Sequence, residues 1–370
     1  MNIEVTDLDD LALGSVFLAT GGGGDPYVTL LATRQLLSER GSATLLPPEQ
    51  LDDDACVVTI GGVGAPTVGL ELLPSVDDVT LALDTFESQT GRRIDAVVSF
   101  EIGGGNSLIP IMAAAARSIP VIDGDGMGRA LPEAQMMTYA IAGVSPTPAV
   151  AVDYAGNTAA FQTDNTATYE RHIRAMAQAM GGMITTVEHP MSGAMLKQSV
   201  VPGTLSFSIA LGRLLRAHRG TACEALLTLR ACFADSIYGD LFHLYTGKVV
   251  DYASSVVGGY DIGAATIESF DGQAAPLRLR VKNEFLVADS DDRVLASVPD
   301  LITVLDYETA APINAERLRY GQRVTVLAVG CPNYYRQPAA LRVVAPGCFG
   351  FDIDFTPVEQ LTQHHVAMPD

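Results

Sequence analysis

The chain has 370 residues, of which 48% are hydrophobic and only 18% are charged, so it can bury a large core. This composition excludes a disordered chain, because disorder requires low hydrophobicity together with high charge. The 43 acidic and 23 basic residues give a net charge of −20. That charge argues against nucleic acids and anionic membrane surfaces as partners, because both require clustered Lys and Arg.

The sequence also bears on where the protein works. No unbroken run of about 18 apolar residues is present, so we expect no membrane-spanning helix. The acidic start, MNIEVTDLDD, is unlike a signal peptide. The five cysteines are odd in number and form no CxxC pair, which is typical of a reducing compartment. We therefore expect a cytoplasmic protein with mostly buried thiols.

Helices and strands are predicted to alternate over residues 1–165. A helix capped by Thr6 ends at the glycine run Gly21–Gly24, and a second helix runs from Pro26 to Arg40. Three short apolar strands follow, separated by helical stretches at 76–89 and 107–117; the strands are Ala55–Ile60, Ala96–Phe100 and Ile119–Ile122. Wholly apolar strands separated by helices indicate a parallel sheet with both faces covered. We expect a doubly wound, mostly parallel α/β domain here.

Residues 166–370 have a different pattern. A helix is expected over 165–180 and a strand over 183–187, and residues 193–233 look helical, with a break near Pro202. From about 240 to 345, short runs of β-forming residues are separated by Gly, Asp and Pro, with no long helical pattern between them. We expect a second, C-terminal domain that is β-rich, either a sandwich or a barrel.

Each predicted parallel strand leads into a loop that carries glycine and a polar side chain. These loops are Gly61–Gly64, Glu101–Asn106 and Asp123–Gly126. Ligands of open parallel sheets bind outside the carboxyl ends of the strands. We therefore expect Glu101, Asn106, Asp123 and Asp125 to lie along one edge of the sheet and to face a pocket. The alternative is that the glycines only shape tight turns and the carboxylates cap helices.

Known nucleotide-binding motifs are incomplete in this sequence. None of the three lysines follows a Walker A loop, and Thr67 stands where the third glycine of a dinucleotide fingerprint would be. ATP and NAD are therefore disfavoured as ligands. The Gly21–Gly24 run could still present backbone N–H groups to an anion or a polar ring, or could be a flexible corner.

A metal site would have to be assembled from distant segments, because no short metal-binding motif such as HExxH is present. His189 ends a predicted strand beside a glycine-bearing turn, and a neutral imidazole with carboxylates suits zinc. We predict a metal site of His189, Asp123 and Asp125, with Asp125 acting as ligand or as general base. A purely structural His189 is the alternative, and Cys331 is then the next candidate.

Several segments together resemble the S-methyl thiohydantoin desulfurase family, a former family of unknown function found beside hydantoinase/oxoprolinase proteins. The N-terminal segments are TGGGGDP, FEIGGGN and VIDGDGMGRALPE, and HPMSG and PGTLSFSIAL follow them. The C-terminal pieces are Asn283-Glu284, PDLI, Tyr320-Gly321-Gln322 and FGFD. The resemblance covers nearly the whole chain.

This resemblance implies a zinc-dependent enzyme that hydrolyses an S-methylated thiohydantoin to the hydantoin and methanethiol, in bacterial breakdown of ergothioneine. The substrate would be a small, uncharged heterocycle. In this scheme Asp125 and Glu101 are the expected catalytic carboxylates. The ring is expected to contact backbone or side-chain groups of the glycine-rich loops, namely Gly22, Gly23, Gly62, Gly104 and Asn106. The competing hypothesis is a non-catalytic subunit that binds such a ligand or partners a hydantoinase-like enzyme. The sequence leaves a homo-oligomer open.

Overall fold

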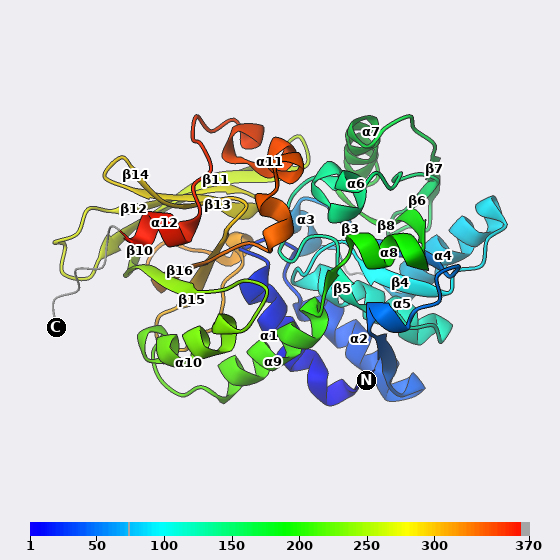
Figure 1. Ribbon diagram of the computed structural model, residues 1–370, viewed down its shortest axis with the longest axis horizontal. Coiled ribbons are helices and arrows are strands. Elements are labelled where there is room, and N and C mark those ends of the chain that lie inside the picture. Colours follow the sequence, from blue (N-terminus) through cyan, green and yellow to red (C-terminus); the bar gives the residue numbers. More distant parts are fainter. Residues whose placement is uncertain (73–74, 364–370) are drawn as a thin grey trace.

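The computed structural model describes residues 1–72 and 75–363, which form two sheets with helices packed around the first (Figure 1). The first half of the chain builds the α/β part on the right of Figure 1, and the sheet at the left comes from residues beyond 240. The α-helices are α1 Leu8–Leu18, α2 Tyr27–Arg40, α3 Pro66–Gly69, α4 Val76–Thr90, α5 Ile109–Arg117, α6 Thr138–Ile141, α7 Thr166–Ala179, α8 Gly193–Ser199, α9 Thr204–Ala217, α10 Ala222–Ala234, α11 Pro338–Val344 and α12 Val358–Gln363.

The first sheet has a parallel centre in the order β2-β5-β4-β3, as predicted for an α/β domain. Antiparallel strands extend it on both sides, β1 beside β2 and β8 beside β3, and the short β9 pairs with β5 outside this order. Both β8 and β9 come from beyond residue 165. Its strands are β1 Asn2–Ile3, β2 Ala43–Leu46, β3 Cys56–Gly64, β4 Ala96–Ser99, β5 Val121–Asp125, β6 Ala149–Val152, β7 Thr158–Phe161, β8 Met183–Ser192 and β9 Val201–Pro202. Because β3, β4 and β5 run parallel, their carboxyl ends meet at one edge.

The second sheet is antiparallel throughout and curls into a half-barrel of seven strands, in the order β14-β13-β12-β11-β10-β16-β15. Its strands are β10 Leu241–Val257, β11 Tyr260–Ser269, β12 Leu277–Lys282, β13 Glu284–Ser290, β14 Arg293–Ser297, β15 Leu301–Asp306 and β16 Arg323–Val329. Alternate side chains of β12 are buried, as expected for a strand with one face on a core. The β-rich C-terminal domain predicted from the sequence is therefore confirmed.

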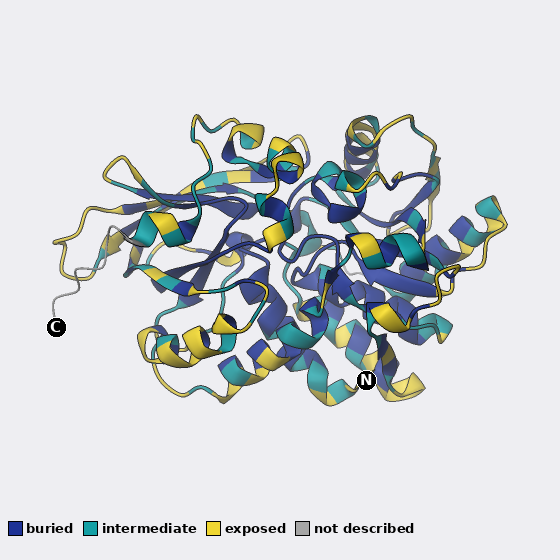
Figure 2. Cartoon of the chain, in the orientation of Figure 1, coloured by how far each residue is buried: buried dark blue, intermediate teal, exposed yellow. Residues whose placement is uncertain are grey.

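Two helices far apart in the sequence, α1 and α9, pack against each other beside the first sheet (Figure 1). Their backbones approach so closely that a Cβ at Gly212 would lie 1.7 Å from the Asp10 carbonyl oxygen. Figure 2 shows buried residues concentrated in the strands of both sheets and exposed residues on the outer helices and loops. None of the helices described is long and apolar enough to cross a membrane.

Candidate active site

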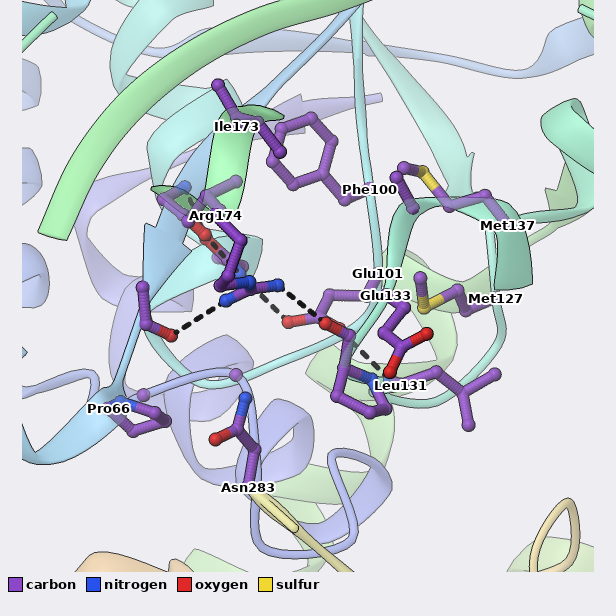
Figure 3. A pocket seen from close by; sticks show the side chains of 18 of the residues that line it. Pro66, Phe100, Glu101, Met127, Leu131, Glu133, Met137, Ile173, Arg174 and Asn283 are labelled. Atoms are coloured by element: carbon purple, nitrogen blue, oxygen red, sulfur yellow. Dashed lines mark hydrogen bonds between the residues drawn. The ribbon is translucent and has the colours of Figure 1, made fainter. Parts of the chain in front are cut away.

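A pocket opens where the carboxyl ends of β3 and β4 face the start of β13. It therefore lies at the junction of the two sheets. Figure 3 shows apolar side chains of Phe100, Met127, Met137 and Ile173 along one side and Asn283 on the opposite side. The polar residues that line it are Glu101, Asn106, Glu133, Glu170, Arg174, Glu188, Asn283 and Glu284.

The glycine run after α1 forms one wall of this pocket, and both halves of the chain hold it in place. From the α/β half, the Asn106 N–H donates to the Gly23 carbonyl at 3.2 Å. From the C-terminal half, the Ala315 N–H donates to the Gly21 carbonyl at 2.8 Å. Within the described residues, neither the Gly23 nor the Gly24 N–H donates a hydrogen bond, so both are available to an acceptor in a ligand.

Glu101 follows β4 and lines the pocket. Its Oε1 accepts a hydrogen bond from Asn106 Nδ2 at 2.8 Å, and its Oε2 accepts one from the Leu131 N–H at 3.2 Å. Asn106 in turn accepts a bond from the Gly62 N–H at 2.7 Å. Burial raises the pKa of Glu101 to about 7, because a buried site disfavours the charged carboxylate. A carboxyl that titrates near neutrality can exchange protons with a ligand.

Glu284, the first residue of β13, brings a second carboxyl into the pocket from the C-terminal half. It is only 2% exposed, and its Oε2 has no hydrogen-bond partner among the described residues. Burial raises the pKa of Glu284 well above its ordinary value, and the nearby charge of Glu101 adds to the shift. The shift favours the protonated form of Glu284, whose O–H could be donated to a ligand.

Arg129 is fully buried behind these two carboxyls and connects the halves of the chain. Its Nη1 donates to the Pro299 and Asp300 carbonyls at 2.6 and 2.8 Å, and its Nη2 donates to Thr20 Oγ1 at 2.8 Å. The positive charge lowers the pKa of Glu101 and of Glu284, but less than burial raises it. Arg129 therefore limits the cost of holding several acidic groups together.

Three of the remaining charged residues of the pocket, Glu133, Glu170 and Arg174, form ion pairs. Arg174 of α7 lies 3.0 Å from Glu170 Oε1 and donates to the Pro132 carbonyl at 2.7 Å. Glu133 pairs with Lys282, which links the rim of the pocket to β12. The positive charge of Arg174 is therefore already matched by a carboxylate before any ligand binds.

Of the predicted ligand-binding residues, Gly23, Gly62 and Asn106 line the pocket and Gly22 and Gly104 do not. A Cβ at Gly22 would lie 2.1 Å from Glu284 Oε1, and one at Gly104 would lie 1.9 Å from the Gly24 carbonyl oxygen. Glycine at these two positions therefore allows close packing around the site.

Asp125 and Asp123 do not line the pocket. Asp125 is fully buried, and its Oδ2 accepts hydrogen bonds from the N–H groups of Ile102, Met127 and Gly128 at 2.8, 2.9 and 2.7 Å. Asp123 Oδ1 accepts a bond from the Ser206 N–H in the first turn of α9, at 3.0 Å. The two aspartates therefore hold different backbone segments. Asp125 connects the loop after β4, at Ile102, with the loop after β5, at Met127 and Gly128.

His189 is fully buried, with Nδ1 3.2 Å from Glu188 Oε1, and it is Glu188 that lines the pocket. In residues 1–72 and 75–363, no three His, Cys, Asp or Glu side chains are arranged to hold a metal ion. The predicted ligands His189, Asp123 and Asp125 therefore do not fit a zinc site. Cys331 is buried as well, and burial raises the pKa of its thiol.

Several pocket residues were not among the predicted site residues: Glu133, Glu170, Arg174, Glu188, Asn283 and Glu284. Glu133 and the pair Asn283-Glu284 lie in segments that carry the family resemblance, but the sequence assigned them no role in the site. One local signal was available for the last two, because Asn283 interrupts a run of β-forming residues and has φ +59°. Asn tolerates this left-handed conformation better than most residues do.

Comparisons with known proteins agree with this architecture. A family model described as "S-Me-THD-like, N-terminal domain" matches residues 6–163, and one described as "S-Me-THD-like, C-terminal domain" matches residues 163–358. A crystal structure of a protein from Chromobacterium violaceum superposes with a TM-score of 0.79 at 22% identity, covering 97% of this chain and 100% of that one. At this identity the likeness shows the fold alone. A comparison with curated proteins found no match. The two family models together span nearly the whole chain, and the protein belongs to the S-Me-THD-like family, as its sequence motifs had indicated.

Proposed function

We propose that this protein is a hydrolase that converts a small S-methyl thiohydantoin-like ring to the hydantoin and releases methanethiol. Membership of the S-Me-THD-like family supports the ring chemistry. The observation that carries the proposal is the pair of buried carboxyls, Glu101 and Glu284, which come from different halves of the chain and line one pocket.

The environments of the two carboxyls suit different roles in acid–base catalysis. Burial raises the pKa of Glu101 to about 7, so a large fraction is ionised at neutral pH and can accept a proton. Burial also raises the pKa of Glu284 well above its ordinary value, and we assign the donation of a proton to this carboxyl. Two buried carboxyls that face one pocket can act as an acid–base pair.

The proposed reaction replaces the C–S bond with a C–O bond. Water adds through its oxygen to the ring carbon that carries the S-methyl group, and Glu101 takes a proton from that water. The C=N π electrons move to the ring nitrogen, which takes the proton of Glu284. The tetrahedral carbon then expels methanethiolate as its hydroxyl becomes the carbonyl. The hydroxyl proton returns to Glu284, and the proton held by Glu101 goes to sulfur, which gives methanethiol and restores both carboxyls.

The glycine loop can hold the ring during these steps. The free N–H groups of Gly23 and Gly24 can donate to the ring carbonyl oxygen, or to the oxygen that gains charge in the tetrahedral intermediate. Since the residues found in the structure do not form the predicted zinc site, every proposed step uses only side chains and backbone groups of this chain.

The test is release of methanethiol from S-methyl thiohydantoin, measured for the wild type, Glu101→Gln and Glu284→Gln. Each substitution removes one proton-transfer group, which typically costs about 10²- to 10⁴-fold in rate. Glu268→Gln is the matched control, because Glu268 is exposed on β11. We expect the control to keep the wild-type rate and both pocket variants to lose at least about 100-fold.

Two results would contradict this proposal. If the wild type releases no methanethiol but binds the hydantoin, the non-catalytic ligand-binding hypothesis replaces it. If Glu101→Gln and Glu284→Gln react as fast as Glu268→Gln, the protein is an enzyme whose proton transfers use other groups.

A further inference from the structure

The pocket contains a third buried glutamate, Glu188, which the proposed proton transfers do not use. Glu188 of β8 pairs with Thr59 of β3, so its side chain is on the same face of the sheet as that of Gly61, two residues further along β3. The Phe100 ring packs on this face, because a Cβ at Gly61 would lie 2.6 Å from the ring. Both Glu188 and Phe100 line the pocket. Glu188 therefore places a carboxyl beside the apolar side of the pocket.

Helix α7 covers this carboxyl and holds one of its oxygens. The side chain of Tyr169, which is fully buried, donates its O–H to Glu188 Oε2. Burial, and then the charge of Glu188, raises the pKa of Tyr169 well above its ordinary value, so the hydroxyl keeps its proton. Ile173, one turn later on α7, lines the pocket. The Tyr169 bond thus fixes the orientation of the Glu188 carboxyl against this wall.

The other oxygen of Glu188 accepts no hydrogen bond from a described residue. His189 Nδ1 lies 3.2 Å from Glu188 Oε1, but neither ring nitrogen of His189 has a hydrogen-bond partner within the described residues, so this contact is not a hydrogen bond. Glu188 is only 1% exposed, so bulk water does not surround its carboxyl. A buried acceptor that lacks a donor is costly, and an N–H from a ligand would remove that cost.

The other carboxyls that line the pocket are less suited to accept from a ligand. Each oxygen of Glu101, Glu133 and Glu170 already accepts a hydrogen bond or an ion pair from the protein. Glu284 has a free Oε2, but its raised pKa favours the protonated form, which donates. Glu188 Oε1 therefore complements a donor in the ligand.

The ring of the proposed reaction carries one donor that the acid–base pair does not use. The carbon that bears the S-methyl group lies between two ring nitrogens. One of them is the C=N nitrogen, which takes the proton of Glu284 in the proposed reaction. The other carries a hydrogen, and an N–H next to such a carbon is a good hydrogen-bond donor.

We infer that Glu188 Oε1 accepts a hydrogen bond from this second ring N–H, and that the contact selects rings in which that nitrogen is unsubstituted. The inference rests on the proposed function, because it takes the ring of that reaction as the ligand. Glu188 is thus a positioning residue, which orients the ring while Glu101 and Glu284 move its protons.

The test measures the dissociation constants of three unreactive rings by calorimetry. The rings are hydantoin, 1-methylhydantoin and 3-methylhydantoin, in which a methyl group replaces the two N–H donors one at a time. A hydrogen bond to a charged group is worth roughly 10- to 100-fold in affinity. We expect the wild type to bind at least one of the methylated rings about tenfold or more weakly than hydantoin.

Glu188→Gln changes the acceptor while keeping the size of the side chain. The Tyr169 hydroxyl will hold the amide oxygen, so the amide NH₂ takes the place of Oε1 and meets the ring N–H, donor against donor. We expect hydantoin to bind at least about tenfold more weakly. The ratio of dissociation constants, methylated ring over hydantoin, should fall about tenfold for one methylated ring and stay within about threefold for the other.

Two further variants accompany it. Glu188→Asp keeps the charge but withdraws it by one methylene, so the same ratio should fall. Glu268→Gln is the matched control, because Glu268 is exposed on β11, and it should keep the wild-type affinity for all three rings. Circular dichroism and the melting temperature confirm that the variants are folded.

The inference is overturned if the wild type binds none of the rings or all three alike, or if both ratios in Glu188→Gln and Glu188→Asp match those of the wild type. An equal loss of affinity for all three rings would mean that Glu188 only supports the fold, and would also overturn it. The proposed reaction is judged separately. A protein that shows the change of ratio but releases no methanethiol loses the reaction and keeps this inference, whereas one that releases methanethiol with unchanged ratios loses only the inference.

Discussion

Asp125 offers a sharp test of how the site is held together, because one carboxylate oxygen accepts three backbone hydrogen bonds. Its Oδ2 receives the N–H groups of Ile102, Met127 and Gly128, and its Oδ1 has no partner among the described residues. Asp125→Asn keeps an acceptor oxygen for these donors, whereas Asp125→Ala removes it. The two variants have the same charge, so their difference isolates the acceptor.

The expected magnitude follows from the number of donors that lose their partner. A buried donor left unsatisfied costs about 1–3 kcal/mol, and partial relaxation of the loop reduces the sum. We therefore expect Asp125→Ala to be less stable than Asp125→Asn by about 3–5 kcal/mol in the free energy of unfolding.

A second comparison, between the wild type and Asp125→Asn, depends on pH. Burial raises the pKa of Asp125 in the folded protein to about 7, from an ordinary value of 3.8. Between these values the folded state binds more protons than the unfolded state, so stability falls as pH rises from about 4 to about 7. The loss is at most about 4 kcal/mol, at 1.36 kcal/mol for each pKa unit. Asp125→Asn has no titratable group at this position, so its free energy of unfolding lacks this dependence on pH.

Urea denaturation at pH 5 and pH 8 measures both effects. Asp125→Asn should gain stability relative to the wild type between pH 5 and pH 8, and the gap between the Ala and Asn variants should not change with pH. If Asp125→Ala were as stable as Asp125→Asn, the three hydrogen bonds would not anchor the loops. A difference between wild type and Asp125→Asn that is the same at both pH values would refute the raised pKa.

Three further predictions concern the pocket. Gly23→Ala should lower the free energy of unfolding by about 2–4 kcal/mol, because its Cβ would lie 2.4 Å from Gly103 Cα. Gly24→Ala should lower it by only about 1–2 kcal/mol, because the one cost there is the positive φ. Thermal denaturation of both variants checks this difference. If Glu101 is the base, kcat/KM should rise between pH 6 and pH 8 and then level off, since burial raises the pKa of Glu101 to about 7; a flat profile would contradict that role. His189→Ala should leave the metal content of the purified protein unchanged by elemental analysis, and loss of a stoichiometric metal would restore His189 as a ligand.

The sequence identified the edge of the sheet that carries the site because that edge follows from a simple geometric rule. Wholly apolar strands separated by helices must be parallel, and parallel strands bring their carboxyl ends together. Glu101, Asn106 and Gly62 follow such strands, and they line the pocket. The helices and the change to a β-rich C-terminal part could also be predicted, because each depends on a pattern of residues that are close together in the sequence.

The errors in the predicted site come from strand irregularities that the sequence does not show. Asp123 and Asp125 were expected to act together because both follow one predicted strand at the edge of the sheet. The register between β4 and β5 shifts before Asp125, and its carboxylate bonds to different backbone segments from that of Asp123. A second shift between β3 and β8 lies beside His189, which has φ +47°, and Glu188 lines the pocket instead. Such bulges re-aim side chains.

Glu284 was missed for a different reason, which also bears on how the site works. Nothing local in a sequence says which residues of one half of a chain will meet the other half. The Phe285 N–H donates to the Thr20 carbonyl at 2.7 Å, and this bond holds the start of β13 against the glycine loop. The burial that raises the pKa of Glu101 and of Glu284 therefore depends on both halves being docked. A solvated Glu101 would titrate near its ordinary value of about 4.3 and would be a weak base at neutral pH. The proton chemistry proposed here is thus a property of the junction, and the α/β half by itself would not have it.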